Sequence, residues 1–321
     1  MSTGGISPMA VLAKGTAGKP VARSSRARER RRDIAQWMAA LPYLAPSLII
    51  FAIFVFYPLI RSVVLSMYAT NSIGQMTRFV GTRYYARLFE SSEYLNSLSV
   101  TARFVLYTVP GVLIVSLLLA TLGNLRLKGI AVYRVAFALP LAISGATAAL
   151  LFMFLYHPTL GPFNYFLDLL HLPRVGWLID PKWALAAVAV PRIWLQAGFA
   201  TVVILAGMQG IPEELFEAAK IDGAGRFAGW WHITLPLITP SLFFLLVVTT
   251  LGAFQTFTEV NVLTNGGPVD ATLVVVQEIY RSFYFNGQYG FASAQALILF
   301  VIMLVLTIIQ FGVIEKRVYY A

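Results

Sequence analysis

The chain of 321 residues contains no cysteine, which excludes disulfide bonds and thiolate metal sites. Charged residues are also scarce, at 12%, about half of what soluble domains carry. Hydrophobic residues make up 58% of the chain, and a soluble fold of this length could not hide so much apolar surface. The composition therefore predicts an integral membrane protein, and the long apolar runs described below predict an all-α one.

A nucleotide-binding loop is missing as well. The nearest match, at residues 15–20, has no glycine five positions before Gly18, and Pro20 stands where a serine or threonine is needed. We therefore expect no ATP site of this type in the chain. His157 and His171 are interpreted as surface residues, so no metal site is expected either. A cleaved signal peptide is not expected, because the leading tail is long and no short apolar core follows it.

Residues 1–37 read as a disordered, basic, cytoplasmic tail, since they are rich in glycine, serine, alanine and proline and show no periodicity. A cluster of arginines precedes the first apolar run; it comprises Arg26, Arg28, Arg30, Arg31 and Arg32. Such a cluster suits either nucleic acid or anionic lipid headgroups. We favour lipid and expect no nucleic-acid partner, because a membrane span follows at once.

Residues 38–321 contain six apolar runs, each close to the roughly 20 residues that a membrane helix needs. The predicted spans are 40–67, 99–122, 133–156, 183–207, 238–261 and 291–314. Lysine and arginine are concentrated on the segments that share a side with the N-terminus. The positive-inside rule then places both termini in the cytoplasm, together with the loop 208–237 between spans four and five.

The loop 208–237 is a polar island that reads as helix, glycine turn, helix, and a proline that starts the next span. Glu217 lies in the first turns of the first helix, where the helix dipole favours negative charge. Ala218 and Ala219 form helix well and leave a smooth face that another protein could approach closely. Gly223 can adopt the left-handed conformation that ends a helix. Composition alone favours an ordinary surface loop, but a helix pair between membrane spans suggests a specific role.

The motif in this loop resembles a known family. The pattern is Glu217-Ala218-Ala219, then Asp222-Gly223-Ala224, then Ile233-Thr234-Leu235-Pro236. It resembles the EAA loop of the permease subunits of binding-protein-dependent ABC importers. Residues 41–46, 263–268 and 289–294 resemble the carbohydrate branch, and residues 241–248 and 309–320 are similar to the first permease subunit of glycerol-3-phosphate and sugar importers. The resemblance runs from Leu41 to Tyr320, and leaves the individual solute open.

The resemblance implies a type I importer permease fold with six transmembrane helices in a bacterial or archaeal cytoplasmic membrane. It implies a non-catalytic subunit, with ATP and magnesium bound by a separate ATPase dimer. Further implied partners are a second homologous permease and an extracytoplasmic solute-binding protein. The residues that would contact or position the ATPase are Glu217, Ala218, Ala219, Asp222, Gly223, Leu235 and Pro236.

Polar side chains inside membrane spans are costly and are functional candidates by default. The candidates for the path of a small polar solute are Arg192, Gln196, Gln255, Glu259 and Thr256. A spacing of four should place Arg192 and Gln196 on one face of span four, and Gln255 and Glu259 on one face of span five. The alternative is an internal Arg192–Glu259 pair near the outer surface, or an arginine that extends outward to the membrane surface.

Two other functions compete with an ABC importer. An ion-coupled secondary transporter should carry ionisable residues near the middle of its spans and usually an internal repeat. We find no carboxylate in the middle of a span and no repeat. A non-transport membrane scaffold would give no reason for the Glu217 loop.

Overall fold

The computed structural model describes residues 42–125 and 127–319, so the predicted tail 1–37 lies outside the described residues. The chain divides into two compact units, Met1–Ile60 and Arg61–Ala321. The described part of the first unit is a helix that begins at Pro42, a favourable residue for a first helical turn. This helix continues to Leu65, and its most apolar window has a mean hydropathy of 2.4, as expected of a membrane span.

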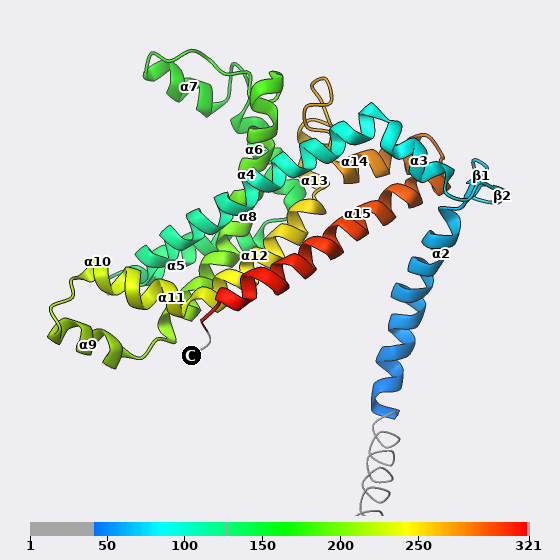
Figure 1. Cartoon of the computed structure of the whole chain (residues 1–321). Coiled ribbons are helices and arrows are strands. Elements are labelled where there is room, and N and C mark those ends of the chain that lie inside the picture. Colours follow the sequence, from blue (N-terminus) through cyan, green and yellow to red (C-terminus); the bar gives the residue numbers. More distant parts are fainter. Residues whose placement is uncertain (1–41, 126, 320–321) are drawn as a thin grey trace, which may run out of the picture. The chain divides into compact units, whose positions relative to one another are not determined.

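The second unit holds one β-hairpin and otherwise helices (Figure 1). Its elements up to the third predicted span are α2 (Tyr57–Leu65, continuing from η1, Ala52–Phe56), β1 (Tyr68–Thr70), β2 (Met76–Phe79), α3 (Arg83–Glu90), α4 (Ser92–Gly123), α5 (Ile130–Ala138), η2 (Leu139–Ala142) and α6 (Gly145–Leu155). Those that follow are α7 (Pro162–Leu169), α8 (Pro181–Gln209), α9 (Glu213–Ile221), α10 (Arg226–Gly229), η3 (Trp230–Thr234), α11 (Leu235–Leu237), α12 (Thr239–Phe254), α13 (Thr258–Leu263), α14 (Val275–Tyr280), η4 (Arg281–Phe285), α15 (Tyr289–Ile309), η5 (Gln310–Ile314) and η6 (Glu315–Arg317).

Four described helices are long and apolar enough to cross a membrane, namely Pro42–Leu65, Ser92–Gly123, Pro181–Gln209 and Tyr289–Ile314. Two bent pairs raise the number to at most six if each pair is one span. The predicted all-α membrane fold is therefore confirmed. Six spans remain the upper count rather than an observed set of six straight helices.

Predicted span three is not a continuous helix. Ile130–Ala142 and Gly145–Leu155 meet at 104°. Pro140 lies in the 3₁₀ turn that ends the first half, and Ser144 starts the second half because its hydroxyl accepts a hydrogen bond from the Thr147 N–H at 3.2 Å. The cap and the proline together favour a new helix over continuation of the old one.

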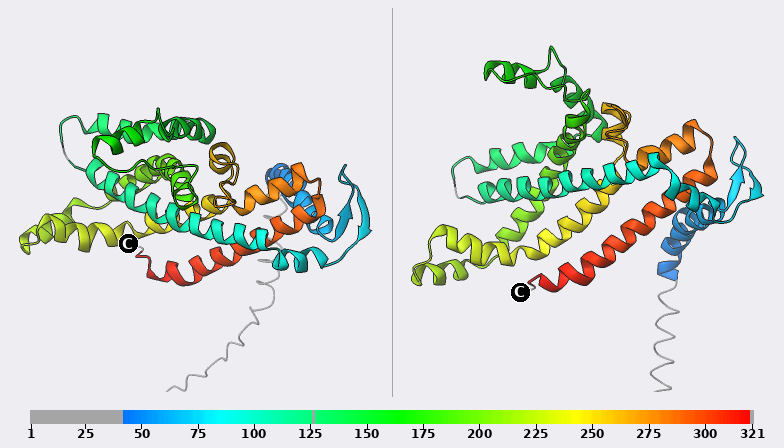
Figure 2. Two further views of the ribbon diagram at one scale, coloured as in Figure 1. Left: turned by 90° about the horizontal axis from the view of Figure 1, so that it is seen from above. Right: turned by 45° about the horizontal axis from the view of Figure 1, so that its top comes forward.

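The core of the second unit lies where α4, α8 and α12 pack together (Figure 2). Gly111 of α4 lets α8 approach closely, because a Cβ at this position would lie 2.6 Å from Ile193 Cδ1. A buried cluster on the three helices includes Val112, Ile204 and Leu245. Close packing through small residues is the usual means of association in lipid, where apolar burial gives little driving force.

The two ends of the second unit differ in content. Figure 1 shows α9, α10 and α11 at one end, and α13 and α14 with their connecting loop toward the other. We call these the coupling-loop end and the far end. The hydrophobic helices α8 and α12 run between the two ends (Figure 1).

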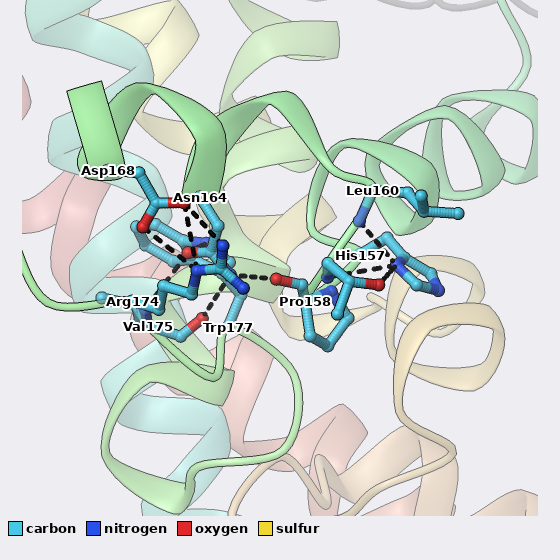
Figure 3. Close-up of polar contacts among 9 residues, drawn as sticks. His157, Pro158, Leu160, Asn164, Asp168, Arg174, Val175 and Trp177 are labelled. Carbon is cyan, nitrogen blue, oxygen red and sulfur yellow. Dashed lines mark hydrogen bonds and ion pairs between the residues drawn. The ribbon is translucent and has the colours of Figure 1, made fainter.

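The segment between α6 and α8 is held in shape by Asn164 (Figure 3). Its Nδ2 donates to the carbonyls of Pro158 at 3.2 Å and Val175 at 3.1 Å, and its Oδ1 accepts from Trp177 Nε1 at 3.1 Å. His157 Nδ1 accepts from the Leu160 N–H at 3.1 Å and thus closes a turn. Among the described residues no cluster of three or more metal-ligating side chains occurs.

Candidate functional site

The first half of the coupling loop is the helix α9, Glu213–Ile221. Glu213 and Glu214 occupy its first turn and Lys220 its last turn, so both ends carry charges that suit the helix dipole. Pro212 is the residue immediately before the helix. The sequence pattern therefore folds locally as it predicts.

Gly223 ends this helix in the predicted left-handed conformation, with φ +82°. Its N–H donates to the Lys220 carbonyl at 3.0 Å, and the Ala224 N–H donates to the Ala219 carbonyl at 2.8 Å. These two bonds form a Schellman motif, which satisfies carbonyls at the helix end and reverses the chain. No atom lies within 4 Å of a Cβ added at Gly223, so glycine is needed here for its backbone conformation rather than for space.

The second half of the loop is anchored to the core. It runs through α10 and η3 into α11, which meets α12 at a bend of 60°. Trp230 Nε1 donates to Thr121 Oγ1 of α4 at 3.2 Å, and Thr234 is buried. The loop therefore moves with the helices that it contacts rather than independently of them.

The tip of the loop presents apolar side chains to its surroundings. Ile221 is 87% exposed, Phe227 76% and Leu215 43%. Among the residues predicted to contact an ATPase, Glu217, Ala218, Asp222 and Gly223 are exposed, Ala219 is half-buried, and Leu235 and Pro236 are half-buried at the base. The structure thus places five of them on α9 and its cap, and two where the loop joins the core.

A second group of predicted residues forms an ion pair near the far end. Arg192 of α8 donates from Nη1 to Glu259 Oε1 of α13 at 3.2 Å, and from Nη2 to the Gly252 carbonyl at 2.9 Å. Glu259 is only 2% exposed, and Thr256 donates its hydroxyl to Glu259 Oε2 at 3.1 Å. The structure therefore contains the internal pair that the sequence left as an alternative.

Gly252 makes room for this pair. A Cβ at Gly252 would lie 2.9 Å from Arg192 Nη2 and 3.3 Å from Gln196 Nε2. Gln196 is thus brought beside Arg192, as their spacing on one helix predicts. Arg192 Nε is buried and has no hydrogen-bond partner among the described residues. The guanidinium group is held through its two terminal nitrogens, Nη1 and Nη2.

The prediction that Gln255 and Glu259 share one helix face is wrong. The helix α12 ends at Phe254, and α13 begins at Thr258, so helical spacing does not apply across the intervening residues. Gln255 is exposed, with Nε2 3.8 Å from Met303 Sδ of α15, whereas Glu259 is buried against α8. The break lets Thr256 reach Glu259, and its polar residues offer the backbone alternatives to helical bonding.

The sequence analysis missed a third polar group, on α14 and α15. Glu278 is 7% exposed, and its Oε1 accepts from Ser282 Oγ at 3.3 Å and Gln295 Nε2 at 3.5 Å. Burial, and next the neighbouring Glu93, raise the pKa of the Glu278 carboxyl. Residues 262–290 lie between two predicted spans, although the apolar run before Gln277 and Glu278 is typical of a buried helix.

Comparisons with known proteins identify the family of the chain. Residues 84–319 match the family described as "Binding-protein-dependent transport system inner membrane component". The chain belongs to this family. It is therefore a permease subunit of a multi-pass membrane transporter, a transport component without catalysis of its own, and the competing scaffold and secondary-transporter hypotheses are not favoured.

Several relatives carry one name, sn-glycerol-3-phosphate transport system permease protein UgpA. The relative from Agrobacterium fabrum is 36% identical over 285 residues, which cover 87% of this chain and 96% of the relative. The relative from Escherichia coli O157:H7 is 36% identical over 288 residues, with coverage of 87% and 96%. The resemblance to carbohydrate-branch permeases is thereby confirmed.

Solved structures show the same fold. A chain of a bacterial alginate ABC transporter in complex with an alginate-pentasaccharide-bound periplasmic protein matches with a TM-score of 0.78 at 25% identity, covering 90% of this chain and 98% of that one. A second alginate importer structure matches with a TM-score of 0.73 at 26% identity, covering 91% and 100%. These matches confirm the type I importer permease fold.

Proposed function

We propose that this permease lines half of the membrane path of an ATP-driven importer, and that the exposed helix pair at the coupling-loop end receives the driving force. The cargo class is a sugar, a polyol or a glycerol-3-phosphate-type solute, supported by the names of the relatives and by the alginate importers. The observation that carries the proposal is the short, capped and core-anchored helix α9, with exposed apolar side chains at its tip.

A helix pair suits this role better than a flexible loop. The Schellman motif at Gly223 fixes the angle between α9 and α10, and Trp230 ties the second half to α4. A push on α9 is therefore transmitted to α4 and α12 rather than absorbed. Ile221 and Phe227 offer apolar surface to a partner, while Glu217 supplies a polar contact beside the smooth Ala218 surface.

The proposal implies three kinds of partner. We infer that an ATPase dimer docks at the coupling-loop end and holds the ATP and magnesium. A second homologous permease completes the path, and an extracytoplasmic solute-binding protein delivers the solute at the far end. Both termini then lie in the cytoplasm, on the side of the ATPase, and the far end faces outward.

The predicted path residues take different parts in this proposal. Arg192 and Glu259 pair with one another, so they join α13 to α8 and neither charge is buried alone. Gln196 and the exposed Gln255 remain as donors and acceptors for hydroxyl groups of a passing solute. Thr256 orients Glu259 through its hydroxyl.

The test is a charge reversal on the exposed helix. Glu217→Lys should strongly reduce transport and transport-linked ATP hydrolysis in the reconstituted importer, because the partner contact reverses sign, while membrane insertion stays normal. Glu90→Lys, an equal charge change on the exposed surface of α3, is the matched control for membrane insertion and folding and should insert and unfold as the wild type does. Normal ATPase coupling in Glu217→Lys would contradict the proposal, as would solute transport by the purified chain alone.

A further inference from the structure

A polar cavity of about 400 Å³ lies at the far end, and neither Arg192 nor Glu259 lines it. We call it the far-end cavity; its lining residues are Glu93, Asn265, Glu278, Arg281, Phe285 and Asn286. They come from the start of α4, the loop after α13, the helix α14, and η4 with the residue that follows it. In Figure 1 the loop and α14 lie far from α9 and α10. Its volume is within the range of about 300–1,000 Å³ for small-molecule sites.

The wall of the cavity is fixed by its own hydrogen bonds. Arg281 donates from Nη1 to Asp270 Oδ1 at 3.2 Å and from Nη2 to the Asn265 carbonyl at 2.7 Å. The Asn265 side chain accepts from Gln277 Nε2 at 2.8 Å. In the same loop, the Thr272 hydroxyl donates to the Gly267 carbonyl at 2.7 Å. These bonds hold the Arg281 and Asn265 side of the cavity in place.

Glu278, which lines the cavity, has a carboxyl oxygen that is free to form a hydrogen bond. It is more than nine-tenths buried, and its Oε2 has no partner among the described residues. The Oε1 atom of Gln295, next to it on α15, also lacks one. A buried oxygen without a partner costs free energy. A carboxyl group that keeps its proton can donate as well as accept, which a carboxylate cannot.

The remaining groups suit hydroxyl groups and not an anion. Asn286 and Asn265 offer amide groups, and Phe285 is 66% exposed and presents a ring. The charge of Arg281 is offset by Asp270, at 3.2 Å, whereas the exposed Glu93 forms no ion pair among the described residues. A phosphate ester would meet the Glu93 carboxylate, while an uncharged solute would not be repelled.

We propose that the far-end cavity is an entry subsite for an uncharged polyhydroxylated solute, a sugar or polyol, on its way to the membrane path. This inference rests on the proposed import function and adds a site and a charge preference to it. The side chains that would contact hydroxyl groups are those of Glu93, Glu278 and Asn286, with Phe285 as an apolar wall. The preference differs from the cargo in the relatives' name, glycerol-3-phosphate, which is an anion.

The experiment is saturation-transfer NMR on the full-length chain in nanodiscs, with two probes that share one ring and differ in charge: D-glucose and glucose 6-phosphate. We expect transfer to the ring protons of glucose, and weaker transfer to glucose 6-phosphate at equal concentration. Asn286→Leu should reduce transfer to glucose about threefold, the effect of one net hydrogen bond. Phe285→Ala should reduce it too.

The matched control is Asn124→Leu, which changes an exposed asparagine at the coupling-loop end. It should leave transfer to glucose unchanged, and thermal unfolding should show that all variants are folded. Equal transfer in the wild type and both cavity variants would overturn the subsite, and stronger transfer to glucose 6-phosphate would overturn the charge preference. Either result leaves the Glu217 test of import unaffected, so the two proposals fail separately.

Discussion

The coupling loop and the far end of the molecule differ in how far apart in the sequence their contacting residues lie. Helix α9 and its cap, at the tip of the loop, are built from contacts between residues close in sequence: charges within one helix, a glycine, and a Schellman motif between Ala219 and Ala224. The far end is built from contacts between residues distant in sequence, such as Arg192 with Glu259 and Glu278 with Gln295. A local arrangement follows from spacing alone, whereas a distant one depends on where helices break and which of them meet.

This difference predicts how each region responds to change. A substitution in the coupling loop should alter communication with a partner and leave most of the stability of the chain intact. A substitution at the far end should alter stability first, because buried polar groups lose their partners there. Four variants test this contrast, in order of decreasing effect on stability.

The largest effect is expected from Arg192→Leu. This change leaves the Glu259 carboxylate 2% exposed and without its cation, and breaking one side of a buried pair typically costs about 3–5 kcal/mol. The measurement is the free energy of unfolding in denaturant-titrated micelles. The double variant Arg192→Leu with Glu259→Leu should recover much of the loss, since no charge is then stranded. A loss in the double variant as large as in the single one would show that packing, not the stranded charge, matters.

Gly252→Ala should have the second largest effect on stability. A methyl group would approach Arg192 Nη2 to 2.9 Å, so the guanidinium must shift, at a cost of about 1–3 kcal/mol for overpacking. Gly312→Ala is the matched control, because a Cβ at that glycine would meet nothing within 4 Å. Thermal unfolding of the two variants distinguishes crowding at the pair from a general effect of removing glycine. Equal stability of both would indicate that the guanidinium adapts freely.

Sequence reasoning performs well at one end and poorly at the other for a physical reason. Ala218 and Ala219 favour helix, and Gly223 ends it through bonds within a few residues, so α9 and its cap could be predicted closely. The break after Phe254 could not, because no proline or glycine occurs between Gln255 and Thr258 to signal it. The far-end cavity was missed for the same reason, since Glu93 and Glu278 meet only through the tertiary fold.

A third variant, Gly223→Ala, should cost about 1 kcal/mol, because an L-residue disfavours the left-handed conformation. Its effect on coupled ATP hydrolysis should be larger than this modest destabilisation suggests, since the angle between α9 and α10 depends on this residue. Gly223→Asn, which tolerates positive φ better, should restore part of the coupling. If both variants couple normally, the angle at Gly223 is not what transmits force.

The smallest effect at low pH is expected from Glu278→Gln, and it should grow as pH rises. Burial raises the pKa of the Glu278 carboxyl, so the folded chain keeps a proton that the unfolded chain releases near pH 4.3. The contribution of Glu278 to stability is complete below that pH and is lost as pH rises through the raised pKa.

Glu278→Gln cannot ionise, so its melting temperature should fall less than that of the wild type over the same rise in pH. Around Glu278, Glu93 of α4 raises the pKa and Arg281 of η4 lowers it, while Gln295 of α15 and Ser282 are uncharged. Glu93→Gln should therefore move the wild-type transition to lower pH, and Glu90→Gln, on the exposed surface of α3, should not move it. Parallel melting-temperature profiles against pH for the wild type and Glu278→Gln would show that this carboxyl is ionised in the folded chain. A buried charge at the far end would then cost no more stability than an exposed charge in the coupling loop.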